Sequence, residues 1–272
     1  MRITIPKFSK KSDLHSYLKT NKSQLIEQKK SMPIFSDAVS LGVSAIKADF
    51  GFKANAPVNE DVDTLRVKVV ANSANWIDSH FDVLLPGCWD KSINERKGII
   101  PHLHDHIHRI EAKVGEVVDI YGSTVSLSEL GLNMQGSTES LIFVTDVMKS
   151  YNEKVFNQYK LGKVKQHSIG LQYMKLDLAI NDDSSEKEYD FWNKHYPQII
   201  NKDVADEYGF FWVVPEIKLI ENSAVLFGSN ELTPTLDNNI KNEPFNNTQK
   251  QDEPSTDTRF IDALKELQTK FK

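Results

Sequence analysis

Residues 164–171 have the sequence VKQHSIGL, a short apolar stretch in which Ser168 is followed by Ile-Gly. The stretch opens a β-strand predicted over Val164–Leu178. Neighbouring side chains on a strand project to opposite faces, so His167 is not expected to reach the Ser168 hydroxyl. Gly170 leaves the backbone bare two residues after the serine, where a substrate chain could approach closely. A base for Ser168 must therefore come from elsewhere in the chain.

Two distant segments supply the other groups that a serine hydrolase needs. Residues 102–108 form the histidine run HLHDHIH, and residues 219–225 form a second predicted strand, LIENSAV, with a carboxylate at Glu221. A serine hydroxyl becomes a nucleophile when a neutral imidazole takes its proton, and a third group usually orients that imidazole. The three segments are consistent with a serine hydrolase. The alternative is that Ser168 is only a small residue that fills a strand position.

The histidine run has a competing interpretation as a metal site. On a strand, all four imidazoles of residues 102–108 would share one face. The run, with Gly98 before it and Glu111 after it, matches the first half of a cupin-type pattern. Such a site needs a second histidine set among Pro and Gly, and neither later histidine of the chain lies in that frame. We expect no metal here and expect three of the four histidines to be polar surface residues.

Most of the central region is predicted to be β-strand. Leu65, Val67 and Val69 alternate with charged residues, which is the pattern of a half-buried strand. A helix is predicted over 138–161, where apolar residues recur near a 3.6-residue period and Gly162 suits the C-terminal end. Many strands with few helices favour a barrel or sandwich over a doubly wound sheet. Further strands are predicted at 114–121, 124–130, 164–178, 210–214 and 217–227.

The chain divides into three zones. Residues 1–60 are a basic extension, with a surface helix predicted to end before Pro33. Residues 61–235 hold the core, and an acidic, aromatic insert at 181–208 is predicted to carry one or two short helices. Residues 236–272 combine an Asn- and Pro-rich linker, predicted to be disordered, with a short amphipathic helix. The apolar stripe of that helix could pack on the core or bind a partner.

The composition limits the classes of function. The 272-residue chain has a formal net charge of −5, which gives no reason to expect nucleic-acid binding, since that usually needs a basic patch. No apolar run approaches the length of a membrane span, and the first residues lack the apolar core of a secretion signal. Cys88 is the single cysteine, which excludes an intrachain disulfide and a cysteine-rich zinc site and fits a reducing cytosol.

Four segments, in order along the chain, resemble the prohead (capsid-maturation) serine proteases of tailed phages. These proteases are similar in fold to the herpesvirus assemblins. The likeness covers about residues 62–235, and a predicted helix precedes the serine segment as it does in the family. The segments are WIDSHFDVLLPGCWDKS (76–92), IPHLHDH followed by VGEV (100–106 and 114–117), LGKVKQHSIGL (161–171) and LIENSAVLFGSN (219–230).

The resemblance implies a mainly β, α+β fold with flanking helices, built as a closed antiparallel β-barrel of the assemblin type. By position in the family's motifs, Ser168 is the nucleophile and His106 is the general base. Glu221 is the expected third member, which orients the imidazole. The family usually has an acidic residue directly after its histidine. Here Asp105 follows His104 instead, so His104 is the reserve candidate for the base.

The implied reaction is amide hydrolysis through an acyl-enzyme, without a cofactor or a metal. The implied substrates are the major capsid protein, the scaffold protein and the protease itself, inside the procapsid in the host cytoplasm. The terminal extensions would tether the enzyme there until self-cleavage releases them. A homo-oligomer is compatible with this function, whereas no nucleic-acid or membrane partner is expected. Two rivals stay open: a cupin-like metal-binding protein that uses His102–His108, and a catalytically inert scaffold or assembly component.

Overall fold

The structure, a computed structural model, describes residue 6 and residues 8–31, 33–35 and 62–237. These residues belong to one unit of the chain, Met1–Ile240, and a second unit comprises Lys241–Lys272. The predicted linker and C-terminal helix therefore lie almost entirely outside the described residues. Among the described residues, no helix combines the length and the apolar character needed to cross a membrane.

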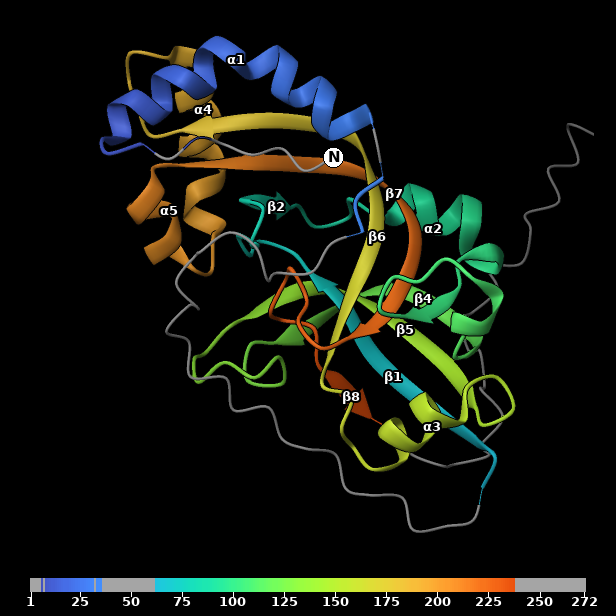
Figure 1. The fold of residues 1–272 in the computed structure, drawn as a ribbon. Helices are drawn as coiled ribbons and strands as arrows, with labels where there is room; N and C mark the ends of the chain where they lie inside the picture. Colours follow the sequence, from blue (N-terminus) through green and yellow to red (C-terminus); the bar gives the residue numbers. More distant parts are fainter. Residues whose placement is uncertain (1–5, 7, 32, 36–61, 238–272) are drawn as a thin grey trace, which may run out of the picture. The chain divides into compact units, whose positions relative to one another are not determined.

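The described residues form an α+β fold with two β-sheets (Figure 1). The first sheet is antiparallel, in the order β4-β5-β1-β8. Leu65, Val67 and Val69 are buried along β1, which confirms the alternation predicted there. The bounds of the strands are Gly115–Ser126 for β4, Ser137–Met148 for β5, Thr64–Ser73 for β1 and Thr235–Asp237 for β8.

The second sheet is centred on β7 (Phe210–Val225). β6 (Gln166–Ile180) pairs antiparallel with β7 along one edge. β2 (Asp82–Leu84) and β3 (His102–His104) pair with β7 in the parallel direction. Within the described residues the strands form these two sheets and no closed ring of paired strands. The α+β class is confirmed, whereas the closed antiparallel barrel is not found, and two pairings are parallel.

β7 unites two strands that are predicted separately, at 210–214 and 217–227. Pro215 lies at the junction, where the register between β7 and β6 shifts between Val213 and Glu216. A proline has no N–H to donate to the ladder, so a strand tolerates it at such an irregularity. The short interruption in the apolar pattern therefore marks a distortion within one long strand and not a turn.

The helix predicted over 138–161 is wrong for its first half. Residues Ser137–Met148 form β5, and helix α3 comprises only Glu153–Lys160. β5 lies between β4 and β1 and is buried on both faces for most of its length. A strand of this kind is apolar almost continuously, so its pattern imitates a helical period. The predicted C-terminal stop is confirmed, because Gly162 follows α3 with a φ of 64°.

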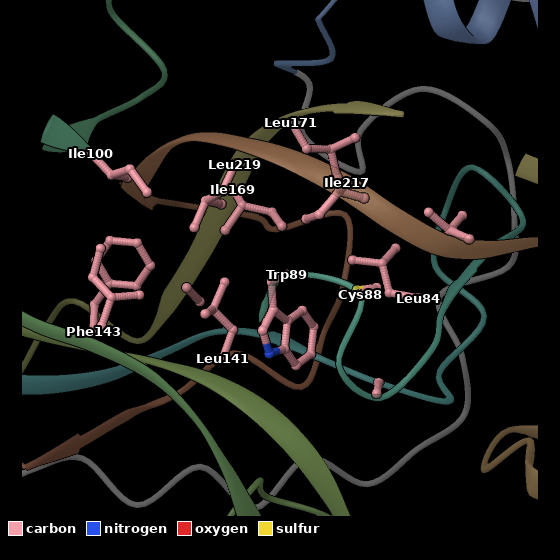
Figure 2. Packing of buried hydrophobic residues seen from close by; sticks show 14 of the residues in the cluster. Leu84, Cys88, Trp89, Ile100, Leu141, Phe143, Ile169, Leu171, Ile217 and Leu219 are labelled. Carbon is pink, nitrogen blue, oxygen red and sulfur yellow. The ribbon is translucent and has the colours of Figure 1, made fainter. Parts of the chain in front are cut away.

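Residues from both sheets share one apolar core (Figure 2). Ile169 on β6 and Leu219 on β7 point toward Leu141 on β5, and all three side chains are buried. Burying a side chain of this size contributes about 1.5–3 kcal/mol, so the core determines which face of β6 turns inward. Because Ile169 faces the core, its neighbours Ser168 and Gly170 project from the opposite face.

Helix α1 (Lys11–Ser31) confirms the helix predicted in the N-terminal extension, and it packs along β6 (Figure 1). The insert forms α4 (Glu186–His195) and α5 (Lys202–Tyr208), which confirms the short helices expected there. α4 also packs on β6. The other helical segments among the described residues are α2 (Asp90–Arg96) and the 3₁₀ turns η1 (Lys97–Ile99), η2 (Ile110–Ala112) and η3 (Tyr196–Gln198).

A buried ion pair ties α1 to the second sheet. Lys29 Nζ lies 2.6 Å from Asp82 Oδ1 on β2, and the two side chains are 7% and 1% exposed. The Tyr173 hydroxyl donates a hydrogen bond to the other oxygen of the same carboxylate. Burial raises the pKa of the Asp82 carboxyl, and the Lys29 ammonium opposes this rise. The carboxylate therefore depends on the cation that α1 supplies.

Lys29→Met is expected to lower the free energy of unfolding by about 3 kcal/mol, because it leaves a buried carboxylate without its cation. Lys22→Met is the matched control. Lys22 lies on the same helix and pairs with Glu188, but these side chains are more exposed, at 18% and 15%, so a loss below about 1 kcal/mol is expected. Urea unfolding followed by circular dichroism measures both values, and equal losses would contradict the importance of the buried pair.

Candidate active site

His106 and Glu221 contact each other directly. His106 Nδ1 lies 2.6 Å from Glu221 Oε1, and the two side chains are 6% and 1% exposed. A carboxylate only accepts hydrogen bonds, so Nδ1 carries the proton and donates it. In the neutral ring, Nε2 then holds the lone pair that can take a proton from a nucleophile. The fold thus joins two of the three predicted site residues.

A tight turn and Ser223 determine where the His106 ring lies. Asp105 and His106 have positive φ values of 50° and 53°, a left-handed conformation that is unfavourable for residues other than glycine. The Ser223 hydroxyl accepts a hydrogen bond from the His106 backbone N–H at 3.1 Å. It also donates one to Glu221 Oε2 at 2.7 Å. Ser223 therefore holds both the turn and the carboxylate that orients the imidazole.

A β-bulge in β7 decides the direction of the Glu221 side chain. Gly170 pairs with Glu221, but the next residue of β6, Leu171, pairs with Leu219, so Ile220 is the extra residue. Leu219 faces the core. Without the extra residue, Glu221 would share that face and its carboxylate would enter the apolar core. The bulge turns the carboxylate to the face of the sheet away from the core.

Ser168 projects from the same face as Glu221. It pairs directly with Ser223 in the antiparallel register, and opposite residues in such a pair project to one face, with Cβ atoms about 5 Å apart. The His106 backbone is hydrogen-bonded to the same Ser223. Ser168 is 4% exposed. The three predicted site residues therefore gather on one face of the second sheet, and the His106–Glu221 hydrogen bond is formed.

Gly170 makes room for the carboxylate of Glu221. A Cβ atom at this position would lie 2.5 Å from Glu221 Oε1 and 2.5 Å from Phe35 Cε1, which is closer than such atoms approach. The bare backbone predicted at Gly170 is present, but two side chains occupy the space above it. One of them, Phe35, comes from the N-terminal extension.

The four histidine rings of the run do not share one face. β3 ends at His104, and the chain then turns at Asp105 and His106. His104 Nδ1 lies 3.0 Å from Asp105 Oδ2, so this ring pairs with its neighbour in the chain. His108 is exposed. The expectation of three surface histidines is wrong for His102, which is fully buried.

His102 and His167 belong to a buried hydrogen-bond network. The hydroxyl of Tyr159 on α3 lies 3.1 Å from His102 Nε2 and 2.9 Å from His167 Nε2. Thr145 Oγ1 and the Thr233 carbonyl oxygen engage the Nδ1 atoms of His102 and His167, at 2.9 and 3.2 Å. Burial lowers the pKa of both rings, that of His167 to about 4. His167 therefore points away from the site, as predicted, and both rings are neutral at pH 7.

The buried histidines predict a fold that loses stability in mild acid. An unfolded histidine titrates near pH 6.5, whereas folded His167 has a pKa of about 4. The unfolded state binds more protons between these two values, so the free energy of unfolding falls as the pH drops through this window. The shift corresponds to a loss of about 3 kcal/mol for His167.

Urea unfolding at about pH 7 and about pH 4.5 measures this loss. The variant His167→Gln should show a smaller difference between the two conditions, because it lacks one group that titrates only after unfolding. His104→Gln is the control and should behave like the wild type, since His104 lies outside the buried network. A free energy of unfolding of the wild type that is the same at both pH values would contradict the prediction.

The described residues contain one group of side chains close enough together to hold a metal ion, and it lies outside the histidine run. The group is Asp78, His80 and Asp82. Asp82 already has the Lys29 ammonium 2.6 Å away, so a resident cation balances the charge of its carboxylate. Within the part of the chain that the structure describes, the histidine run forms no such group.

The sequence-based prediction missed two residues of this region, Ser223 and Phe35. A signal for Ser223 exists, because residues two apart on a strand share a face and Ser223 follows Glu221 at that spacing. No local pattern points to Phe35. It belongs to the extension that the prediction separates from the core, and only the tertiary fold brings it to the site.

Comparisons with protein-family models, with curated proteins and with solved structures find no match to this chain. The resemblance to prohead proteases therefore stays a prediction. The hydrogen bonds of His106 and Glu221 and the strand register of Ser168 are the structural basis for a function.

Proposed function

We propose that the chain is a serine endopeptidase in which Ser168 is the nucleophile, His106 the general base and Glu221 the orienting carboxylate. The 2.6 Å hydrogen bond between His106 Nδ1 and Glu221 carries the proposal. A carboxylate at Nδ1 fixes the tautomer of the base and stabilises the imidazolium that forms during the reaction. Further support comes from the register of β6 and β7, which directs the Ser168 side chain to the same face as Glu221.

The proposed reaction has two stages. First, His106 Nε2 takes the proton of the Ser168 hydroxyl while the oxygen attacks the scissile carbonyl, and a tetrahedral intermediate forms. The imidazolium gives the proton to the leaving amine nitrogen, the C–N bond breaks, and an acyl-enzyme remains. A water molecule then attacks the acyl carbon while His106 Nε2 takes its proton, the C–O bond to Ser168 breaks, the imidazolium returns the proton to the serine oxygen, and the acid is released. The Glu221 side chain, hydrogen-bonded to His106 Nδ1, stabilises each imidazolium.

His106 is a stronger candidate for the base than His104. The carboxylate partner of His104 is Asp105, whose side chain is 62% exposed. Water screens such a pair, so the carboxylate does little to orient the ring or to stabilise its charge. The partner of His106 is buried and receives a second hydrogen bond from Ser223. A preorganised carboxylate of this kind is what a general base requires.

The substrates and the place of cleavage follow from the resemblance alone. The substrates would be scaffold protein, capsid-protein extensions and the chain itself, cleaved inside a phage procapsid in the host cytoplasm. The closed barrel of the assemblin type also follows from the resemblance alone and stays a prediction.

Of the rivals, a metal site in the histidine run loses its main support because the rings do not converge. An inert assembly component is separated from an enzyme by the following experiment.

A fluorophosphonate probe tests the nucleophile without knowledge of the substrate. An activated serine oxygen displaces fluoride from such a probe and becomes phosphonylated, whereas an ordinary serine reacts slowly. We expect the full-length wild type to be labelled on the tryptic peptide that contains Ser168, as mapped by mass spectrometry. Ser168→Ala should remove the label. Ser126→Ala is the control, because Ser126 lies on β4 of the other sheet.

The labelling pattern decides between the candidate functions. Label on the Ser168 peptide that disappears in Ser168→Ala and persists in Ser126→Ala supports the endopeptidase. Absence of label from both the wild type and Phe35→Ala, which uncovers Gly170, rejects the proposal in favour of an inert assembly component if the same probe marks a reference serine protease. Label on a different serine would reject Ser168 as the nucleophile.

A further inference from the structure

The edge of β6 that faces away from β7, here called the outer edge, passes beside Ser168. Ile34 forms an antiparallel bridge with Leu171 on this edge. The Ile34 N–H donates to the Leu171 carbonyl at 2.7 Å, and the Leu171 N–H donates to the Ile34 carbonyl at 3.1 Å. Alternate residues of an antiparallel strand direct their backbone groups to the same edge. Ile169, next to the serine, therefore presents its N–H and C=O to the outer edge as well.

Phe35 follows Ile34 and places its ring over the candidate site. The ring centroid lies 4.1 Å from that of His108, in an edge-to-face contact, and 6.5 Å from that of His106. Its Cε1 atom lies 2.5 Å from the position that a Cβ at Gly170 would take. The ring thus covers the bare backbone two residues after Ser168. A side chain of a peptide bound along the outer edge would occupy the same surface.

Helix α1 holds residues 33–35 at the outer edge. The helix is anchored by buried Leu25 and by the buried ion pair of Lys29. Beyond it, Gln172 Nε2 on β6 donates to the Lys30 carbonyl at 3.2 Å. The chain leaves the helix at Ser31 and reaches the outer edge three residues later, at Ile34. A segment tethered in this way has a high effective concentration at its site without tight contacts of its own.

We propose that the outer edge of β6 binds extended peptides with a large apolar side chain over Gly170, and that residues 33–35 occupy this edge as an internal competitor. The inference rests on the proposed endopeptidase function, because it names the substrate class of that site. Main-chain hydrogen bonds to an open strand edge provide affinity for such peptides, and side-chain contacts provide specificity. Ile34 makes the main-chain bonds and Phe35 makes the side-chain contact. A substrate must displace both residues before its carbonyl reaches Ser168.

Peptide binding to the full chain tests the competitor. The probe is a fluorescein-labelled synthetic peptide with the sequence of residues 30–39, KSMPIFSDAV, and fluorescence anisotropy measures its Kd. All proteins carry Ser168→Ala, which prevents turnover. Adding Phe35→Ala should lower the Kd at least about tenfold, because the competing ring is gone and the edge is open more often. Ile34→Pro should act in the same direction, since proline lacks the N–H that bonds to Leu171.

Matched controls separate opening of the edge from general effects. Phe8→Ala removes an aromatic ring from the same extension, where Phe8 contacts Tyr17, and it should leave the Kd unchanged. A peptide with alanine in place of its phenylalanine should bind the opened variant at least about tenfold more weakly. An unchanged Kd in both Phe35→Ala and Ile34→Pro, with native circular dichroism spectra, overturns the competitor. Equal binding of the two peptides overturns the apolar side-chain preference.

Failure of this inference can be told apart from failure of the proposed function. If the fluorophosphonate labels Ser168 at the same rate in the wild type and in Phe35→Ala, the endopeptidase stands and the internal competitor is rejected. If the peptide binds as expected but neither the wild type nor Phe35→Ala takes up label, the peptide-binding edge stands and the endopeptidase is rejected. Faster labelling of Phe35→Ala together with tighter peptide binding supports both.

Discussion

Ser168→Ala is expected to abolish proteolysis, with a loss of about 10⁶-fold in kcat. The proposed nucleophile is the Ser168 oxygen, and alanine leaves His106 with no hydroxyl proton to take. The fold should be unaffected. Alanine removes one oxygen, and the neighbours on that face of the sheet, Ser223 and Glu221, are hydrogen-bonded to each other. Any residual hydrolysis would come from binding and electrostatic effects alone.

Co-expression with candidate capsid and scaffold proteins, followed by gel electrophoresis and mass spectrometry, measures this loss. Wild type should produce new fragments, of the chain itself or of its partners, that Ser168→Ala does not produce. Ser126→Ala should give the wild-type pattern, since it changes a serine on the other sheet. Identical band patterns for wild type and Ser168→Ala would show that no proteolysis depends on this serine.

His106→Ala is expected to have an effect of similar size, a loss of about 10⁶-fold in kcat, because nucleophile and base act as a unit. The decisive comparison is His104→Ala, which removes the neighbouring imidazole that pairs with Asp105. We expect this variant to retain activity within about tenfold of the wild type. Initial rates on a peptide cut by the wild type measure both effects.

The reverse outcome would reassign the base. A large loss in His104→Ala, with activity retained in His106→Ala, would mean that His104 is the base. The acidic residue that directly follows a histidine, here Asp105, would then mark the base, as the resemblance to prohead proteases implies. Equal losses in both variants would indicate that the turn itself, and not one ring, is required. Fluorophosphonate labelling of the two variants checks the result, since only the true base should be needed to activate Ser168.

Local patterns in the sequence predicted the strands that carry the site. The segments predicted at 164–178 and 217–227 correspond closely to β6 and the second half of β7. Alternation along β6 also correctly separated His167 from Ser168, since the direction of a side chain on a strand is a property of its nearest neighbours. The same kind of pattern did not predict β5, because this strand is buried on both faces and its apolar and polar residues do not alternate.

The choice among the histidines could not be predicted from alternation. A regular strand through 102–108 would place all four rings together, but Asp105 and His106 adopt positive φ values and end the strand. Residues other than glycine rarely adopt this conformation, and although Asp and His do so more often than most, their presence is too weak a signal to predict it. It is held by a long-range hydrogen bond from the His106 N–H to the Ser223 hydroxyl.

By itself, the sequence predicted β1, β6 and β7, the residues that could act as nucleophile, base and carboxylate, and the projection of His167 away from Ser168. Only the tertiary structure decided that Glu221 meets His106 and that Phe35 covers Gly170. The direction of Glu221 depends on one extra residue, Ile220, in the pairing of β7 with a strand about fifty residues earlier. Strand register depends on the partner strand and on the core, so no pattern within a single segment could specify it.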